Sequence, residues 1–339
     1  MIIAGYEEFG SSTEIVDLTI EGGNKCNDWP VGPIAYQLSW HESYFLGGLI
    51  GNNPIICNTY TTECHILSKE GVTVAKNMSM RRRSPASIVL SDSKMWISGG
   101  YFYDYSLDSD WDQVILVSSE FITKDGSLPG PDIPMPMFGH VIVSINDTCS
   151  MTIYAPMPDH YNYYGGYFVI WSPVSPTFYY DHAESEWING PDLLQGREAF
   201  AAGIVTDEVT NENFVAVTGG YVYDTTGWLD DYWGDFNTSE ILQDGEWIQG
   251  PLLPIPLEGH SMVRLGKGQA LLGGSNINYN QESYGLQKKI YLMTCSDRNC
   301  IISLFNRQLS APRSFFVAIP IPDSMTGCST KGEYDFHLL

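Results

Sequence analysis

Short runs of apolar residues recur along the whole chain, and clusters of Gly, Pro, Asn, Asp and Ser separate them. Runs of this length between turn residues predict β-strands, and no stretch shows the periodicity of an amphipathic helix of three turns. Two sets of predicted strands alternate. The first set, called strand b, covers residues 1–6, 54–57, 95–101, 151–155, 214–221 and 270–274. The second set, called strand c, covers residues 13–18, 64–67, 114–117, 177–181, 239–242 and 289–292.

A hexapeptide repeats behind strand c. The sequence Glu-Trp-Ile-Gln-Gly-Pro at 246–251 has a near copy, Glu-Trp-Ile-Asn-Gly-Pro, at 186–191. Reduced copies keep Gly-Pro at 130–131 and Trp with Gly-Pro at 29–33. Self-similarity at a fixed spacing is typical of repeat architectures. The hexapeptide is therefore interpreted as strand d, the last strand of a repeat, followed by a turn into the next repeat.

Each next repeat begins with a further strand, called strand a, nine residues after the Pro. Its first residue is His140, Phe200 or His260, and Arg197 stands three positions before Phe200. Two other arginines, Arg83 and Arg313, precede similar apolar runs and are assigned to the Arg197 position. With one degenerate copy near residue 39, six repeats at a spacing of about 56 residues account for the chain.

The repeats predict one all-β domain over residues 1–339, a closed ring of six four-stranded blades. The chain starts on a b strand and has a spare a strand near its end, so residues 314–320 are expected to pair with residues 1–6 and close the ring. The predicted blades are 314–320 plus 1–34, 35–80, 81–134, 135–195, 196–255 and 256–311, with a tail at 321–339.

Gly-Gly after an apolar strand, a Tyr- or Asp-containing strand, a Trp, and then Arg or His before the next strand together resemble the kelch repeat of β-propellers. The resemblance covers nearly the whole chain and implies a toroid of blades around a central channel; another all-β sandwich or barrel is the alternative. Gly-Gly permits positive φ, the Trp rings fill gaps between blades, and the Arg and His side chains make contacts between blades. The residues assigned to this structural repeat are Trp29, Arg83, Gly99, Gly100, His140, Trp187, Arg197, Gly219, Gly220, Trp247, His260, Gly273, Gly274 and Arg313.

The formal net charge of −23 argues against a nucleic-acid partner, because phosphate binding needs a basic face and the one basic cluster, residues 81–83, is short. The acidity is most simply explained by solubility. A cationic ligand or a Ca²⁺ site is the more specific hypothesis. No stretch has the about 18 apolar residues of a membrane span. We expect a monomer.

Cysteines and glycosylation motifs bear on the compartment. Cys57 with Cys64, and Cys295 with Cys300, flank short polar turns between apolar runs and are predicted to form two disulfides. The three remaining cysteines, Cys26, Cys149 and Cys328, have no obvious mates. Asn-x-Ser/Thr acceptor motifs occur at Asn77, Asn146 and Asn237. Residues 1–6 read as a strand and not as a secretory leader, so we expect either a secreted protein whose leader is absent from this sequence, which these features favour, or a cytoplasmic one.

The loops between strands b and c carry the candidate binding residues. In an antiparallel meander these loops emerge on the same face as the turns between strands d and a. In blades 3 to 5 they mix rigid aromatic rings with carboxylates, which suits a protein or glycan ligand, including a basic peptide; packing over the blade edges is the alternative. The candidates are Tyr101, Tyr103, Asp104, Trp111, Tyr163, Tyr164, Trp171, Tyr223, Trp228, Asp230, Asp231 and Trp233.

No catalytic constellation can be assembled from the sequence. There is no His pair at metal-ligand spacing, no Gly-x-Ser-x-Gly elbow and no Gly-rich phosphate loop. Some kelch-like propellers are copper-radical oxidases whose site uses a Tyr cross-linked to Cys, and others epimerise sugars, but no Cys here has a clear Tyr partner. We therefore expect a binding module without cofactor or metal. A sugar-acting kelch enzyme that uses the channel mouth stays open as the alternative.

Overall fold

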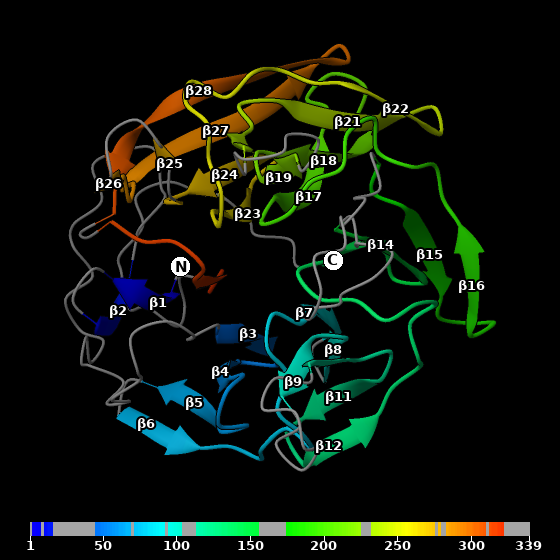
Figure 1. Ribbon diagram of the computed structural model, residues 1–339, viewed down its shortest axis with the longest axis vertical. Helices are drawn as coiled ribbons and strands as arrows, with labels where there is room; N and C mark the ends of the chain where they lie inside the picture. The colour runs from blue at the N-terminus through cyan, green and yellow to red at the C-terminus, as the bar shows by residue number, and fades with distance from the viewer. Residues whose placement is uncertain are drawn as a thin grey trace.

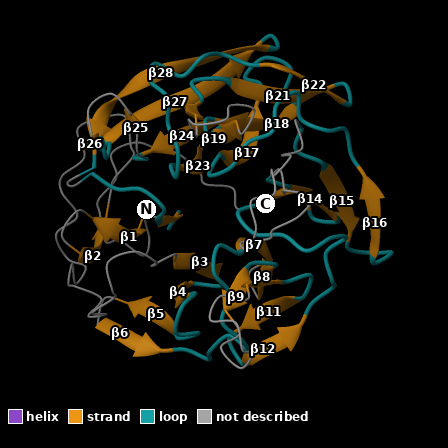
Figure 2. Cartoon of the chain, in the orientation of Figure 1, coloured by secondary structure: helices purple, strands orange, loops and turns teal. Residues whose placement is uncertain are grey.

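The computed structural model describes residues 2–7, 10–15, 45–68, 71–91, 94–103, 113–155, 174–224, 232–274, 277–278, 283–309 and 312–321. These residues form a ring of antiparallel sheets, and the described part of the chain contains no helix (Figures 1 and 2). Within each four-stranded sheet the strands follow one another outward from the centre of the ring in chain order (Figure 1). The predicted all-β class and the β-propeller arrangement are confirmed.

Five sheets have four strands each, and we keep for them the names blade 2 to blade 6. Blade 2 has β3 (Phe45–Ile50), β4 (Asn53–Asn58), β5 (Cys64–Ser68) and β6 (Gly71–Val74), and blade 3 has β7 (Ala86–Ser91), β8 (Lys94–Ser98), β11 (Ser119–Thr123) and β12 (Gly126–Pro129). Blade 4 has β13 (Val141–Asn146), β14 (Cys149–Ile153), β15 (Thr177–Asp181) and β16 (Glu186–Asn189). Blade 5 has β17 (Ala201–Thr206), β18 (Asn213–Thr218), β21 (Ser239–Gln243) and β22 (Glu246–Gln249), and blade 6 has β23 (Ser261–Leu265), β24 (Gly268–Leu272), β27 (Lys289–Ser296) and β28 (Asn299–Gln308).

A sixth sheet joins the two ends of the described chain. It has three strands, β1 (Ile2–Glu7), β2 (Gly10–Ile15) and β29 (Val317–Ile319), in the order β2-β1-β29. The pairing of β1 with β29 is antiparallel and places Ile2 opposite Ile319, as the closing strand predicts. The expectation of six four-stranded blades is corrected to five, because this sheet has three strands among the described residues; residues 16–44 lie outside them.

Short two-stranded hairpins extend three blades between their second and third strands. They are β9 (Tyr101–Tyr103) with β10 (Gln113–Ile115), β19 (Tyr221–Asp224) with β20 (Tyr232–Asp235), and β25 (Ile277–Asn278) with β26 (Ser283–Tyr284). The hairpin in blade 3 corrects one predicted strand. Residues 114–117 were expected to be the third strand of that blade, but Gln113–Ile115 pairs with β9, and β11 pairs with β8 instead. Two apolar runs follow one another there, and local pattern cannot tell which one continues the sheet.

The core lies between neighbouring blades. Each blade contributes apolar side chains to clusters that it shares with the next blade, as sheets packed face to face do. Trp96 of β8 is fully buried, and its ring lies 5.3 Å from Tyr180 and 5.9 Å from Trp187 of blade 4. An aromatic contact of this kind fills the widening space between two blades and fixes their spacing.

Two disulfides each join adjacent strands at directly opposed positions. Cys57 of β4 is bonded to Cys64 of β5, and Cys295 of β27 is bonded to Cys300 of β28. Both predicted pairs are therefore confirmed. Cys149 is a free, half-buried thiol, and Cys26 and Cys328 lie outside the described residues. Structural disulfides are typical of proteins in oxidising, extracellular surroundings.

Candidate ligand-binding face

The hairpins and the blade-to-blade turns meet on one face of the ring. In blade 3 the main chain of Arg83, just before the first strand, exchanges hydrogen bonds of 2.7 and 2.9 Å with Tyr101 at the start of the hairpin. In blade 5 Glu198 and Tyr221 make the same pair of bonds, both 2.9 Å. The loops carrying the candidate aromatic residues therefore start beside the turns that lead into the innermost strands, as strand alternation requires.

Main-chain hydrogen bonds link these turns from blade to blade. One residue in each turn has positive φ, namely Ser84, Gly139, Ala199, Gly259 and Phe315. The N–H of Gly139 donates to Ser84 O, that of Gly259 to Ala199 O, and that of Phe315 to Gly259 O, at 2.7 to 2.8 Å. These bonds hold the inner turns at fixed relative positions, so side chains beside them are presented from a rigid base.

A cluster of arginines and tyrosines covers this face at blades 2 and 3. The Arg83 guanidinium lies 5.2 Å from the ring centre of Tyr60, 4.6 Å from that of Tyr103 and 6.0 Å from that of Tyr101. The guanidinium of the exposed Arg81 lies 5.6 Å from the ring centre of Tyr60. Guanidinium groups over aromatic faces are attracted by the ring quadrupole, which holds the tyrosines in place. We call these five residues the tyrosine–arginine cluster.

The aromatic surface continues toward blade 4, and a carboxyl group follows in blade 5. The ring of Phe138 lies 5.1 Å from that of Tyr101. Glu198 occupies the same position in blade 5 as Arg83 in blade 3, since both form the bridge to the hairpin. Burial raises the pKa of the Glu198 carboxyl to about 7, and a hydrogen bond with the Tyr221 side chain opposes that shift. The face thus has a cation at blade 3 and a carboxyl that titrates near neutrality at blade 5.

The arginine position of the repeat is filled by Arg82, not by Arg83 as the sequence suggested. Arg82 is buried, and its Nε lies 3.0 Å from Glu120 Oε1 while its Nη1 donates to Gly99 O at 2.9 Å. Arg197 makes the equivalent contacts with Glu240 at 3.0 Å and Gly219 O at 2.9 Å. In three consecutive arginines, apolar pattern alone cannot decide which one turns inward. The shift of one residue is what places Arg83 on the ligand-binding face.

The arginines bond within the blade that they enter, whereas two histidines make blade-to-blade contacts in blades 4 and 6. The Nε2 of His140 lies 2.8 Å from Ser98 Oγ, and the Nε2 of His260 lies 2.8 Å from Thr218 Oγ1. Both rings are buried, and burial lowers their pKa values to about 3, so both are neutral. His140 and His260 are 120 positions apart, as Gly99 and Gly219 are, so the true repeat spans two blades. Their burial leaves no surface for ligand contact.

The repeated Trp and Gly residues also have contacts within the ring. Trp187 Nε1 donates to Asp132 O at 2.8 Å, and Trp247 Nε1 donates to Pro191 O at 2.9 Å, in each case across to the Gly-Pro segment of the preceding blade. The Gly-Gly doublets at 99–100, 219–220 and 273–274 all have positive φ. Arg313 is 1% exposed, and Trp29 lies outside the described residues.

Four of the twelve predicted binding residues lie within the described part of the chain. Tyr101 and Tyr103 lie in the tyrosine–arginine cluster, and Tyr223 stands opposite Trp233 in the β19–β20 hairpin. The remaining candidates, Asp104, Trp111, Tyr163, Tyr164, Trp171, Trp228, Asp230 and Asp231, lie outside the described residues. Sequence reasoning missed Tyr60 and Glu198. A signal for Tyr60 was available, because it stands two residues after β4, close to the position of Tyr101 three residues after β8.

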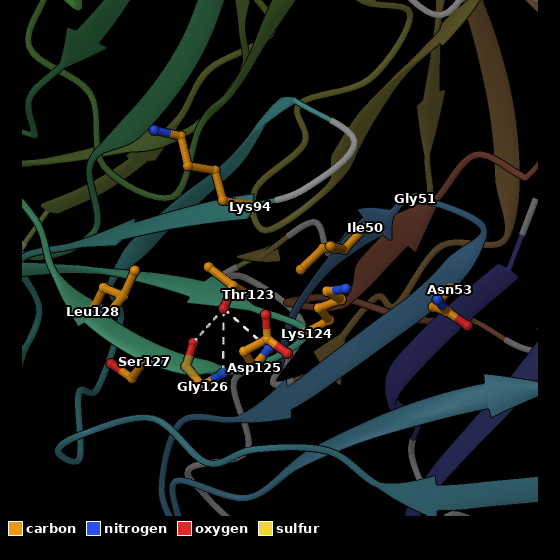
Figure 3. A pocket seen from close by; sticks show the side chains of 10 residues that line it. All are labelled: Ile50, Gly51, Asn53, Lys94, Thr123, Lys124, Asp125, Gly126, Ser127 and Leu128. Carbon is orange, nitrogen blue, oxygen red and sulfur yellow. Dashed lines mark hydrogen bonds between the residues drawn. The ribbon is translucent and has the colours of Figure 1, made fainter.

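A different surface lies on the opposite face, where the first and second strands of a blade are joined. Turn residues of blades 2 and 3 line a hollow of about 590 Å³ there, including Lys94 and Lys124 (Figure 3). The Thr123 hydroxyl accepts hydrogen bonds from the N–H groups of Asp125 and Gly126, which fixes the turn. Among the residues that the structure describes, no group of His, Cys, Asp and Glu could hold a metal ion, and no helix is long and apolar enough to cross a membrane.

The ring of sheets defines the chain as a β-propeller protein. No protein-family model matches the chain, and no curated protein matches it. Among solved structures it is similar to one described as "Structure of YjhT", with a TM-score of 0.44 and 10% sequence identity over 77% of this chain and 97% of that one.

Proposed function

We propose that the chain is a non-enzymatic binding module of kelch-propeller type that engages a protein or glycan through the face carrying its second-to-third-strand loops. The observation that supports this proposal best is the tyrosine–arginine cluster. Its rings are half-buried rather than enclosed, and blade-to-blade hydrogen bonds hold the turns beside it. Rigid aromatic and arginine side chains are the groups that dominate binding energy at interfaces, because they bury large areas at low entropic cost.

The proposal is tested with two variants on opposite faces of the ring, each of which replaces two side chains by alanine. Tyr60→Ala with Tyr103→Ala removes rings from the cluster, and Lys94→Ala with Lys124→Ala alters the hollow on the far face. Labelled proteins are compared on a glycan array and on a panel of cell-surface protein ectodomains. We expect the tyrosine variant to lose binding at least about tenfold, the equivalent of 1.4 kcal/mol. Equal binding by both variants and the unaltered chain contradicts the proposal.

A second candidate, a sugar-acting enzyme that uses the central mouth of the ring, is favoured by one observation. Glu198 has a pKa of about 7 because of its burial, and general acid–base catalysis works best with a group that titrates near the operating pH. The discriminating measurement is turnover on a panel of free sugars by the unaltered chain and by Glu198→Gln. Turnover that Glu198→Gln abolishes would establish the enzyme and reject the binding module.

Several finer features belong to the same proposal. We infer that the three-stranded sheet is blade 1 of a six-bladed ring, that the repeats are of kelch type, and that the protein is secreted and glycosylated. The repeat positions filled by Gly-Gly, Trp, Arg and His support the kelch assignment, and the two disulfides support secretion. Asn77, Asn146 and Asn237 are all exposed, as acceptor sites must be. Mass spectrometry of the protein secreted from eukaryotic cells tests whether these three side chains carry glycans.

A further inference from the structure

The outer edge of blade 6 differs from the outer edges of blades 2 to 5. β28 has 10 residues, whereas β6, β12, β16 and β22 have 4 each. β28 runs along the outside of the ring, and no described strand pairs with its outer side (Figure 1). At about 3.4 Å per residue, this edge is about 34 Å long. It is the longest outer strand among the described residues.

β28 also lacks the features that protect an edge strand. Such an edge offers N–H and C=O groups to other extended chains, and soluble proteins guard it with short strands, charges or proline. β12 ends at Pro129, and β16 and β22 begin at Glu186 and Glu246. β28 has a single charged residue and no proline. Its Ile301 and Leu304 side chains are 60% and 64% exposed.

The hairpin that carries this edge is held rigidly. The Cys295–Cys300 disulfide fixes the register of β27 and β28. The Asp207 carboxylate of blade 5 accepts hydrogen bonds from the N–H groups of Asp297 and Arg298, at 3.1 and 2.6 Å, in the turn between the two strands. A fixed edge loses little conformational entropy when another strand joins it.

The turn also carries a cation. Arg298 forms ion pairs with Glu212 at 3.0 Å and with Asp244 at 2.8 Å, so these two carboxylates of blade 5 share a cationic partner beside the start of β28. Residues 256–311 contain six Lys and Arg against three Asp and Glu, although the whole chain carries a formal charge of −23. Blade 6 is therefore the cationic part of an acidic protein.

The spacing of the strands indicates which groups are available. The Cα atoms of Cys295 and Cys300 are 4.0 Å apart, which is typical of a pair that does not exchange main-chain hydrogen bonds. Ile302 and Leu304 follow at alternate positions, so their N–H and C=O groups also point away from β27. These are the groups that an added strand would engage.

We propose that β28 is a self-association surface, at which a second copy of this chain adds its own β28 antiparallel and forms a two-fold dimer. An antiparallel edge is its own complement, because a two-fold axis perpendicular to the sheet pairs the strand with itself. Two copies of a chain with charge −23 repel one another over most of their surfaces, and the approach costs least where carboxylates are fewest or compensated. This proposal differs from the monomer expected from the sequence.

Sedimentation equilibrium of the full chain tests the proposal, with concentration and NaCl varied. We expect a monomer–dimer equilibrium that strengthens with salt, because salt screens the repulsion between the acidic copies. The variant Ile301→Lys with Leu304→Lys places two charges at the edge and is expected to weaken dimerisation at least about tenfold. If the unaltered chain keeps the monomer mass of 37.8 kDa at all concentrations, the proposal is overturned. This holds even if β28 pairs with a strand of another protein, because the proposed partner is a second copy of this chain.

The matched control is Ile188→Lys with Ile248→Lys, which adds the same charge to the short outer strands β16 and β22. Those side chains are 54% and 41% exposed. The control is expected to dimerise like the unaltered chain, and an equal loss in both variants would place the interface elsewhere. Hydrogen exchange of the unaltered chain gives a readout that needs no variant. Peptides covering residues 299–308 must become protected as the concentration rises, and protection confined to other strands overturns the proposal.

Discussion

His140 and His260 should make the ring unstable in mild acid. Each ring is buried between two blades with its Nε2 bonded to a hydroxyl of the preceding blade, and its Nδ1 has no hydrogen-bond partner among the described residues. The folded protein therefore has no group ready to stabilise an imidazolium there. Both pKa values lie at about 3, below the value of about 6.5 for histidine in an unfolded chain.

The sign of the effect follows from this depression. Because the unfolded chain takes up protons at a higher pH than the folded one, stability is full above about pH 6.5 and decreases as the pH falls toward 3. At pH 5 the unfolded state gains about 2 kcal/mol for each histidine, and about 4 kcal/mol for both. A loss of this size is a large part of the roughly 5–15 kcal/mol that is the usual stability of a folded domain.

Urea denaturation at pH 8 and at pH 5 measures the effect. The variant His140→Gln with His260→Gln keeps polar side chains but cannot titrate, so its pH-dependent loss should be smaller than that of the unaltered chain by about 4 kcal/mol. Each single variant should remove about half of the difference. If the unaltered chain and the double variant lose stability in parallel between pH 8 and 5, the buried histidines are not the cause and the reasoning is refuted.

Three further predictions concern the ring itself. Arg197→Met should lower the free energy of unfolding by about 3–5 kcal/mol, because the buried Glu240 carboxylate loses its partner. Arg197→Met with Glu240→Gln should recover most of this loss in urea denaturation. If the single variant is as stable as the unaltered chain, the ion pair does not have this role. Gly219→Ala should lower the thermal unfolding temperature more than Gly245→Ala does. Both residues have positive φ, but a Cβ at Gly219 would lie 2.2 Å from Leu257 O, while Gly245 has open space around it. Equal losses would show that backbone strain accounts for the whole effect and that the close contact adds nothing. Removing the Cys57–Cys64 disulfide by Cys57→Ser with Cys64→Ser should cost about 2.5 kcal/mol from loop closure, and an unchanged denaturation midpoint would contradict this.

Much of the candidate site was beyond the reach of sequence reasoning. The face was predictable, because strand alternation alone puts the long loops and the blade-to-blade turns on the same side. The composition of the face was not. Arg82 and Arg83 are neighbours in one run of three arginines and both are buried, but Arg82 pairs with Glu120 whereas Arg83 packs against the tyrosine rings. Which of the two side chains pairs with Glu120 depends on a one-residue register that only the packed blade specifies.

The sequence by itself determined the all-β class, the closing strand and both disulfides. Each of these depends on local features that recur in phase, namely short apolar runs, turn residues and cysteines at opposed positions. The tertiary structure decided which arginine pairs with the buried glutamate of its blade, that histidines contact the preceding blade in blades 4 and 6, and that Tyr60 and Glu198 lie on the candidate face. It also decided that the third strand of blade 3 is β11 and that β28 is left as a long outer edge. These features arise between segments far apart in the chain, where packing and hydrogen bonding select among alternatives that local pattern leaves equal.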